Sequence, residues 1–157
     1  MIKKMETNRI QISRAIIENA NILADFNVKM AKETENKELN FDKVLNATKE
    51  VFLSNDKGFY LKAIYNGKIV GSMLITYEWS DWRNGFFWWI QSVYVLKEYR
   101  NKGIFKSLYN YARNLAKEKK DVCGLRLYVD KDNEAAQNVY KKLGMYETNY
   151  LLFEEEF

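Results

Sequence analysis

The stretch that decides the fold lies in the middle of the chain, where residues 86–108 read FFWWIQSVYVLKEYRNKGIFKSL. Residues 86–95 are apolar at most positions, as expected of a central strand that is covered on both faces. After a short charged turn, apolar residues recur at helical spacing over 104–119, at Ile104, Leu108, Ala112, Leu115 and Ala116. The stretch therefore predicts a central strand that runs directly into a helix.

Two further strands are predicted just before the central one. Apolar side chains alternate from Phe59 to Tyr65, and a second strand pattern covers Ile69 to Tyr77. Between them stands Asn66-Gly67, a pair suited to the two positive φ angles of a type I′ turn. We expect a hairpin here, and the central strand returns after the polar stretch 80–85 to make three antiparallel strands.

The two ends of the chain complete the order. Outside the middle, the predicted elements are a strand at Ile10–Ile12, helices over 16–28 and 41–53, a strand over 125–129, a helix over 136–143 that Gly144 can end, and a strand around 145–153. This is an α/β fold, a mixed sheet flanked by helices, in the order β-α-α-β-β-β-α-β-α-β. Because no repeat or linker interrupts it, one domain spanning residues 1–157 is predicted.

Composition excludes several kinds of chemistry. The chain has no histidine, which excludes Ser-His-Asp and Cys-His catalysis and histidine-based zinc sites. Its single cysteine, Cys123, cannot form an internal disulfide, and its apolar neighbours predict a buried and unreactive side chain. We expect no metal.

Charge and hydropathy bear on partners and location. The net charge is +4, but the basic residues are scattered along predicted helices, so solvated helix faces are favoured over a nucleic-acid groove. No apolar run reaches the ~18 to 20 residues of a membrane helix, so no membrane partner is expected. The N-terminal residues Met1 to Arg9 lead into no apolar segment of a secretory signal, and we expect a cytoplasmic protein.

The turn between the central strand and its helix has the features of a phosphate site. A helix N-terminus leaves several backbone N–H groups without partners, at the positive end of the helix dipole. Gly103 stands at this turn, and Arg100, Lys102 and Lys106 add positive charge. The turn suits a pyrophosphate, although an ordinary turn with solvated basic residues would have the same composition. Neither of the common nucleotide motifs, G-x-x-x-x-G-K-[ST] and G-x-G-x-x-G, occurs.

Two motifs extend this interpretation. The first is Arg100-Asn101-Lys102-Gly103-Ile104-Phe105, and the second is Asn133-Glu134-Ala135-Ala136 followed by Tyr140 and Gly144. In order and spacing they resemble the acetyl-CoA loop and the following strand-helix segment of the GNAT N-acetyltransferase superfamily. The loop pattern in that family is Arg or Gln, two residues, Gly, one residue, then Gly or Ala, and Phe105 departs from the last position. The resemblance covers residues 58–150.

The resemblance implies acetyl-CoA as the acyl donor. Its pantetheine arm would lie along the backbone of Val93, Tyr94 and Val95, where one N–H would hold the oxyanion. The loop residues Arg100, Asn101, Lys102, Gly103, Ile104, Phe105 and Lys106 would hold the pyrophosphate. Asn133 and Ala136 would also contact the cofactor, and the Tyr140 hydroxyl would lie near its sulfur as the general acid. From its helix position alone, Tyr140 would instead be a core aromatic.

The acceptor amine must lose a proton before it can attack. A lysine-like amine with a pKa of ~10.4 is neutral only about one part in 10³ at pH 7, which costs ~4 to 5 kcal/mol. Where some family members carry a glutamate on the central strand, this chain has Trp89, and Gln91 on the same side could only orient a water. The candidate carboxylates are Glu78, Asp81, Glu33 and Glu35. We favour Glu78, although loop carboxylates are often only solvated charges.

Four tryptophans stand beside two of these carboxylates, at positions 79, 82, 88 and 89. They could line a pocket for a cationic amine through cation–π contacts, and we place Trp79 and Trp89 in the acceptor site with Asp81. Packing in the core and the hairpin is the alternative.

We therefore predict an acetyl-CoA-dependent N-acetyltransferase of a primary amine, with a small-molecule amine favoured. Transfer would be direct, in a ternary complex, because the chain offers no obvious nucleophile for an acetyl-enzyme. The alternatives are a peptide or protein amine as acceptor, a non-catalytic acyl-CoA-binding sensor of the same fold, and a basic nucleic-acid-binding protein. The aromatic surplus also leaves room for a homodimer.

Overall fold

The computed structural model describes residues 10–157, and the expectation for Met1 to Arg9 lies outside the described residues. The chain forms two compact units, the first up to Leu127 and the second Tyr128–Phe157. Each is described by itself. The elements of the first unit are β1 (Ile10–Arg14), the short 3-10 helix η1 (Ile17–Asn19), α1 (Ala20–Glu35), α2 (Phe41–Leu53), β2 (Phe59–Tyr65), β3 (Lys68–Ser80), β4 (Gly85–Val95), the 3-10 helix η2 (Lys97–Tyr99), α3 (Ile104–Glu118) and β5 (Val122–Arg126).

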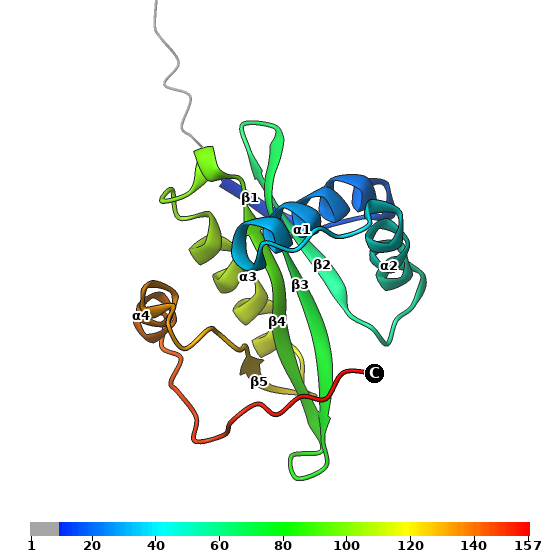
Figure 1. Ribbon diagram of the computed structural model, residues 1–157. Coiled ribbons are helices and arrows are strands. Elements are labelled where there is room, and N and C mark those ends of the chain that lie inside the picture. Colours follow the sequence, from blue (N-terminus) through cyan, green and yellow to red (C-terminus); the bar gives the residue numbers. More distant parts are fainter. Residues whose placement is uncertain (1–9) are drawn as a thin grey trace, which may run out of the picture. The chain divides into compact units, whose positions relative to one another are not determined.

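The first unit is built on one mixed five-stranded sheet in the order β1-β2-β3-β4-β5 (Figure 1). The first four strands pair antiparallel, and β5 pairs parallel to β4. β2 and β3 are joined by Asn66 and Gly67, whose φ angles are +49° and +80°. The type I′ hairpin predicted from the sequence is confirmed, and so is the mixed α/β fold.

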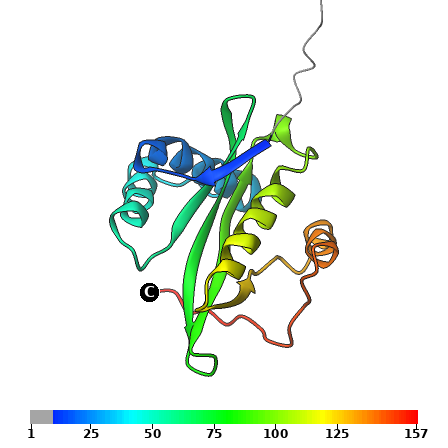
Figure 2. The ribbon, with the colours of Figure 1, turned by 180° about the vertical axis from the view of Figure 1, so that it is seen from behind.

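The helices cover opposite faces of this sheet. α1 and α2 lie on one face and α3 on the other, which the view from behind shows most clearly (Figure 2). On the α1 face, the ring of Tyr94 lies 5.3 Å from that of Phe26. On the α3 face, a side chain at Gly71 would meet Ile104 of α3. Because side chains alternate along a strand, this assigns every residue of β3 to one face or the other.

The core lies mainly between the sheet and its helices. The fully or nearly buried apolar side chains include Leu23 and Phe26 of α1, Met73 and Ile75 of β3, Trp88 and Ile90 of β4, and Leu108 and Ala112 of α3. Met73 and Ile75 share the α3 face with Gly71. On α3, the apolar stripe that the sequence predicted is buried at Ile104, Leu108, Ala112 and Ala116.

The second unit contains α4 (Glu134–Lys142), and Gly144 follows it with a φ of +90°, as predicted for a glycine that ends a helix. The strand predicted around 145–153 is wrong, because no helix or strand follows α4 within residues 128–157. A strand needs a neighbour to satisfy its backbone groups, and α4 is the one regular element of this unit. The side chains of Tyr150, Leu151, Leu152 and Phe153 are accordingly exposed.

Two other sequence predictions differ from the structure. β5 begins at Val122 and ends at Arg126, earlier than the predicted 125–129. Cys123 is exposed, which overturns the prediction of a buried thiol. The reason is that β5 is the last strand in the sheet order and therefore has a partner on one side alone within the first unit. In the described part of the chain, no helix is long and apolar enough to cross a membrane.

Candidate functional site

The central strand β4 has one open edge. Its parallel pairing with β5 covers Phe86 to Trp89, and the last pair is Trp89 with Arg126. From Ile90 to Val95, β4 stays paired with β3 on one side, while no strand of residues 10–127 pairs with its other side. The backbone of Val93, Tyr94 and Val95 therefore lies on an open sheet edge, to which an extended polar chain could add as a strand would.

A β-bulge lies in the same part of β4. Ser72 pairs with Tyr94 and Leu74 pairs with Gln91, so Ser92 and Val93 together face Met73. Ser92 has a φ of +47°, in the left-handed region that a serine rarely occupies. A bulge bends its strand and increases the local twist, and this one lies just beyond the point where the pairing with β5 ends.

The turn from β4 into α3 ends in a left-handed glycine. Asn101 has a φ of +61°, and Gly103, the N-cap of α3, has a φ of +80°. No side chain of the described residues caps this helix, and the first N–H groups of an α-helix have no acceptor within the helix. A side chain added at Gly103 would meet nothing within 4 Å, so there is open space beside the turn. The turn has the form of an anion site.

Lys102, Phe105 and Lys106 of this turn have different surroundings. The Lys102 ammonium lies 5.0 Å from the ring centroid of Tyr99, and Lys106 is exposed. The Phe105 ring lies 6.3 Å from that of Tyr109, farther along α3.

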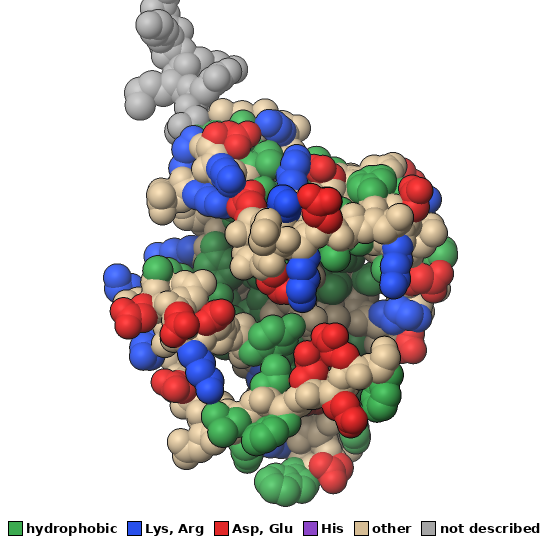
Figure 3. All heavy atoms as spheres, viewed as in Figure 1, with side chains coloured by type: hydrophobic (Ala, Val, Ile, Leu, Met, Phe, Trp, Pro, Cys, Tyr) green, Lys and Arg blue, Asp and Glu red, His purple; other side chains and the backbone are tan. Residues whose placement is uncertain are grey.

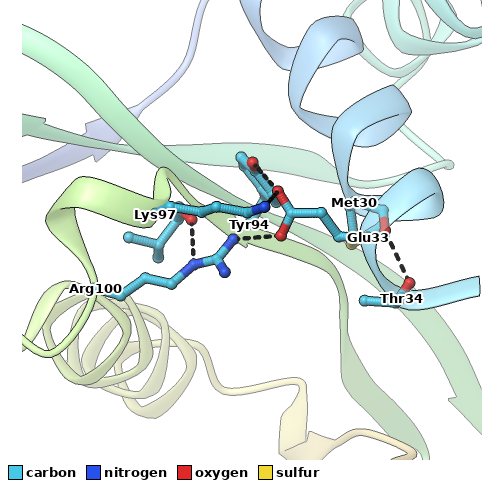
Figure 4. A network of polar contacts seen from close by, with 7 residues as sticks. Met30, Glu33, Thr34, Tyr94, Lys97 and Arg100 are labelled. Carbon is cyan, nitrogen blue, oxygen red and sulfur yellow. Dashed lines mark hydrogen bonds and ion pairs between the residues drawn. The ribbon is translucent and has the colours of Figure 1, made fainter.

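Arg100 connects the turn to α1 through Glu33 (Figure 4). Its Nε donates to the Val95 carbonyl at 2.9 Å, and its Nη2 donates to Glu33 Oε2 at 2.7 Å. The other oxygen of Glu33 accepts from the Tyr94 hydroxyl at 2.8 Å and lies 3.7 Å from Lys97 Nζ. The carboxylate thus ties α1 to β4 and to the turn.

This network has electrostatic consequences for both of its acids. The hydrogen bond from Arg100 is the largest of the effects that lower the pKa of Glu33, which keeps its carboxylate ionised. Burial, helped by the hydrogen bond to Glu33, raises the pKa of Tyr94 to about 12, so its hydroxyl stays protonated as a donor. Glu33, one of the candidate carboxylates from the sequence, is engaged with Arg100, Lys97 and Tyr94 in the structure.

The α1 face of the sheet brings three predicted residues together. Glu78, Trp89 and Gln91 all lie on it, because their strand partners are Phe87, Thr76 and Leu74 in one continuous register. The Gln91 amide donates to the Thr76 hydroxyl at 2.6 Å. The Glu78 carboxylate forms an ion pair with Arg126, whose guanidinium lies 3.6 Å from the Phe87 ring centroid.

Other predicted acceptor residues are not brought together. Trp79 lies on the opposite face from Glu78, with its ring 4.9 Å from that of Phe86, so it does not share a site with Trp89. Asp81 lies in the β3–β4 turn, where its Oδ1 accepts from the N–H of Trp82 at 2.9 Å. Glu35, at the end of α1, pairs with Lys37 at 2.6 Å.

The four tryptophans therefore do not line one pocket. Trp88 is nearly buried, and its ring lies 5.1 Å from that of Phe59 on the α3 face. Trp79 and Trp82 are 54% and 86% exposed. Trp79 lies on the same face as Trp88 and Trp82 lies in the β3–β4 turn, so Trp89 is the one strand tryptophan on the α1 face. Strand alternation alone separates positions 88 and 89, so this much could have been read from the sequence.

The predicted residues of the second unit lie on or just before α4. The Asn133 side chain caps this helix and accepts from the N–H of Ala136 at 3.1 Å. Tyr140 lies on α4 and is half-buried, and burial raises the pKa of its phenol. The phenol is therefore protonated at neutral pH and has a proton to donate, although the raised pKa makes it a weaker acid than a free phenol.

Sequence reasoning missed two pairings of the predicted residues. Arg126 pairs with a residue 48 positions away, and Arg100 pairs with Glu33 over 67 positions. No local pattern marks either pair, because strand register and helix packing bring them together.

Charges of both signs are intermixed over the face drawn in Figure 3, which agrees with the scattered basic residues of the sequence.

Comparison with known families and structures gives a consistent result. Residues 20–145 match the model of a family described as the acetyltransferase (GNAT) family. A comparison with curated proteins gives no match. The crystal structure of a possible acetyltransferase from Clostridium difficile 630 has 46% identity and a TM-score of 0.88, over 94% of this chain and 97% of that one.

More distant structures share the fold. A ribosomal-protein-alanine N-acetyltransferase from Brucella melitensis biovar Abortus 2308 has 16% identity and a TM-score of 0.74, over 95% of this chain and 100% of that one. An aminoglycoside N-acetyltransferase in complex with CoA has 15% identity and a TM-score of 0.77, over 97% of each chain.

Proposed function

The chain belongs to the GNAT acetyltransferase family, and from this premise we propose that it transfers the acetyl group of acetyl-CoA to a primary amine, with a small-molecule amine as the favoured acceptor. The observation that carries the proposal is the open edge of β4 beside the left-handed turn at Gly103. The acyl donor of the family is acetyl-CoA. The open edge suits its pantetheine arm, and the turn suits its pyrophosphate.

The residues present fit acetyl-CoA. The open backbone of Val93, Tyr94 and Val95 can pair with the amides of a pantetheine arm, and the α3 N-terminus with the loop from Arg100 to Lys106 can hold a pyrophosphate. Space beside Gly103 leaves room for a phosphate to approach the backbone. When bound, acetyl-CoA would supply an acetyl thioester, whose acetyl group passes to the amine nitrogen as the thiol leaves.

The chain's own groups would manage the protons and the oxyanion. A backbone N–H of the open edge would polarise the acetyl carbonyl. Glu78, the carboxylate on the α1 face of β3, would take the amine proton directly or through a water that Gln91 orients. The Tyr140 hydroxyl, which is protonated at neutral pH, would donate to the leaving sulfur, with Asn133 and Ala136 near the cofactor.

A direct test measures thiol release from acetyl-CoA over a panel of small amines, amino acids, aminoglycosides and peptides. In Tyr140→Phe we expect kcat to fall by about 10²-fold with little change in KM for acetyl-CoA, because a general acid acts on the chemical step. Tyr146→Phe is the matched control, since this tyrosine is 85% exposed in the same unit. An unchanged kcat in Tyr140→Phe would remove Tyr140 from the mechanism.

One observation favours a second candidate, a non-catalytic acyl-CoA-binding sensor. Trp89 stands where some family members carry a glutamate, and the Glu78 carboxylate is engaged by Arg126. Tight CoA binding without turnover of any amine in the panel would support the sensor over the enzyme.

A further inference from the structure

An ion pair crosses the α1 face at the point where β4 and β5 part. Arg126 is the last residue of β5 and pairs with Trp89, the last residue of β4 that has a partner in β5. Its side chain reaches back over Phe87 of β4 to Glu78 of β3. The pair therefore lies beside the beginning of the open edge proposed to hold the acyl donor.

Two guanidinium groups contact the ring of Phe87. A second guanidinium, that of Arg83 in the β3–β4 turn, lies 5.0 Å from the ring centroid of Phe87, while Arg126 lies at 3.6 Å. Glu78, the strand partner of Phe87, supplies one carboxylate. Arg126 is paired with Glu78, and Arg83 forms no ion pair within the described residues.

The pair is only partly open to water. The side chains of Arg126 and Glu78 are 32% and 40% exposed. In such a place, removing one partner leaves the other charge partly desolvated and unpaired, which is unfavourable. An acceptor that is only a cation would take Glu78 and leave the guanidinium of Arg126 without its partner. An acceptor that carries an amine and a carboxylate would satisfy Glu78 and Arg126 together.

We propose that the acceptor is a zwitterion of the α-amino acid type, which exchanges with the Glu78–Arg126 ion pair. Its carboxylate binds the guanidinium of Arg126, and its ammonium binds Glu78. This inference rests on the proposed acetyl transfer and names the class of its acceptor.

The step is balanced. Glu78 takes one proton from the ammonium, the neutral nitrogen forms a C–N bond with the acetyl carbon, and the C–S bond of acetyl-CoA breaks. The sulfur leaves as the thiol with a proton from the general acid. The nitrogen's second lost proton goes to water, and the product is an N-acetylated amino acid that keeps its carboxylate on Arg126. The planar guanidinium suits a carboxylate because it can donate two parallel hydrogen bonds.

The test compares acceptors that differ only in the carboxylate, such as phenylalanine with phenethylamine and leucine with 3-methylbutylamine. Thiol release by the unaltered protein should give a kcat/KM at least about tenfold higher for each amino acid, the equivalent of one charge-assisted hydrogen bond. Equilibrium dialysis of the same compounds with CoA-saturated protein gives a readout besides turnover. Equal or better use of the decarboxylated amines overturns the inference and leaves acetyl transfer standing, whereas no thiol release with any amine overturns both.

A variant of Arg126 tests whether this residue causes the preference for the amino acid over the decarboxylated amine. Arg126→Met keeps an unbranched chain on Phe87 but removes the charge, and it should reduce the preference for the amino acid to less than about twofold. Arg14→Met is the matched control, because Arg14 lies 3.8 Å from the ring of Phe59 on the α3 face and should leave the preference unchanged. A preference that persists in Arg126→Met overturns the assignment. If that variant does not fold, the comparison in the unaltered protein still decides the inference.

Discussion

At the scale of single residues, two glycines share one conformation but serve different turns. Gly67 and Gly103 both have a φ of +80°, and a side chain added at either would meet nothing within 4 Å. A substitution at either position therefore costs backbone strain and no steric clash. Gly67 lies in the β2–β3 hairpin, whereas Gly103 begins α3 at the proposed phosphate site.

We expect Gly103→Ala and Gly67→Ala each to lower the free energy of unfolding by about 1 kcal/mol, because an L-residue in the left-handed region is strained by that order. The two should differ in function. Gly103→Ala should also raise KM for acetyl-CoA several-fold, since the first N–H groups of α3 would shift, and Gly67→Ala should not. Urea denaturation measures the stabilities, and titration with acetyl-CoA measures KM. Equal KM values for Gly103→Ala and Gly67→Ala would show that Gly103 does not contribute to the donor site.

Glu33 is another single residue with a structural role, because its carboxylate connects α1 to the turn through Arg100. Because Arg100 lowers its pKa in the folded protein, the stability that Glu33 adds is fully present above its unfolded value of 4.5 and is lost as the pH falls through the folded value. Glu33 is therefore a source of acid sensitivity at the turn.

In Glu33→Gln we expect the free energy of unfolding at pH 7 to fall by about 1 kcal/mol, the usual order for a charged hydrogen bond that is partly solvated. The difference from the unaltered protein should shrink as the pH drops below 4.5. Urea denaturation at several pH values checks this, with Glu35→Gln as the control on the same helix. A difference that is constant down to pH 3 would contradict the role of the carboxylate charge.

At the scale of elements, β4 determines where the site lies. Its first part pairs with strands on both sides, and its last part, from Ile90 onward and including the bulge at Ser92, has an open edge. The bulge also changes which residues share a face, so that Gln91 and Tyr94 both lie on the α1 face although three positions separate them. One strand thus contributes to the core and to the proposed donor and acceptor sites.

We expect Ser92→Val to destabilise the protein by about 1 to 2 kcal/mol, because a β-branched side chain is strongly disfavoured at a φ of +47°. Ser80→Val, at the end of β3 and outside the left-handed set, is the control and should change stability by less than about 0.5 kcal/mol. Thermal denaturation of both variants measures this. Equal stability would argue against the bulge.

At the scale of the whole molecule, the two units carry different parts of the proposed chemistry. The first unit holds the open edge, the turn and the ion pair of Glu78 with Arg126, and the second holds Asn133 and Tyr140. The family supplies the reason to assign one reaction to both, since its model matches residues 20–145 and so spans parts of each.

Binding of the donor should stabilise the whole protein. At a CoA concentration of 100 times its Kd, linkage predicts about 2.7 kcal/mol, which for a chain of this size raises Tm by about 5 to 10 °C. A thermal-shift titration measures it, and adenosine at the same concentration is the control for a ligand without the pyrophosphate and pantetheine. The absence of a shift with CoA at any concentration would contradict a donor site.

The sequence by itself determined the order of elements up to α4, the type I′ hairpin, the left-handed turn that ends α4, and the family. These features depend on local rules: the period of apolar residues, the positive φ that Asn-Gly and Gly permit, and two short motifs. Local rules also produced errors, among them the strand predicted after α4, because that segment contains apolar residues but has no strand to pair with in its unit.

The tertiary structure alone decided which side chains meet. The Glu33–Arg100 and Glu78–Arg126 pairs, the exposure of Cys123 and the open edge of β4 all follow from strand order, register and helix packing. Contacts between residues far apart in the chain depend on how every intervening element is placed, and no short window of sequence contains that information. For this reason the loop motif of the family could be recognised in the sequence, while the pairing of Arg126 with Glu78 could not.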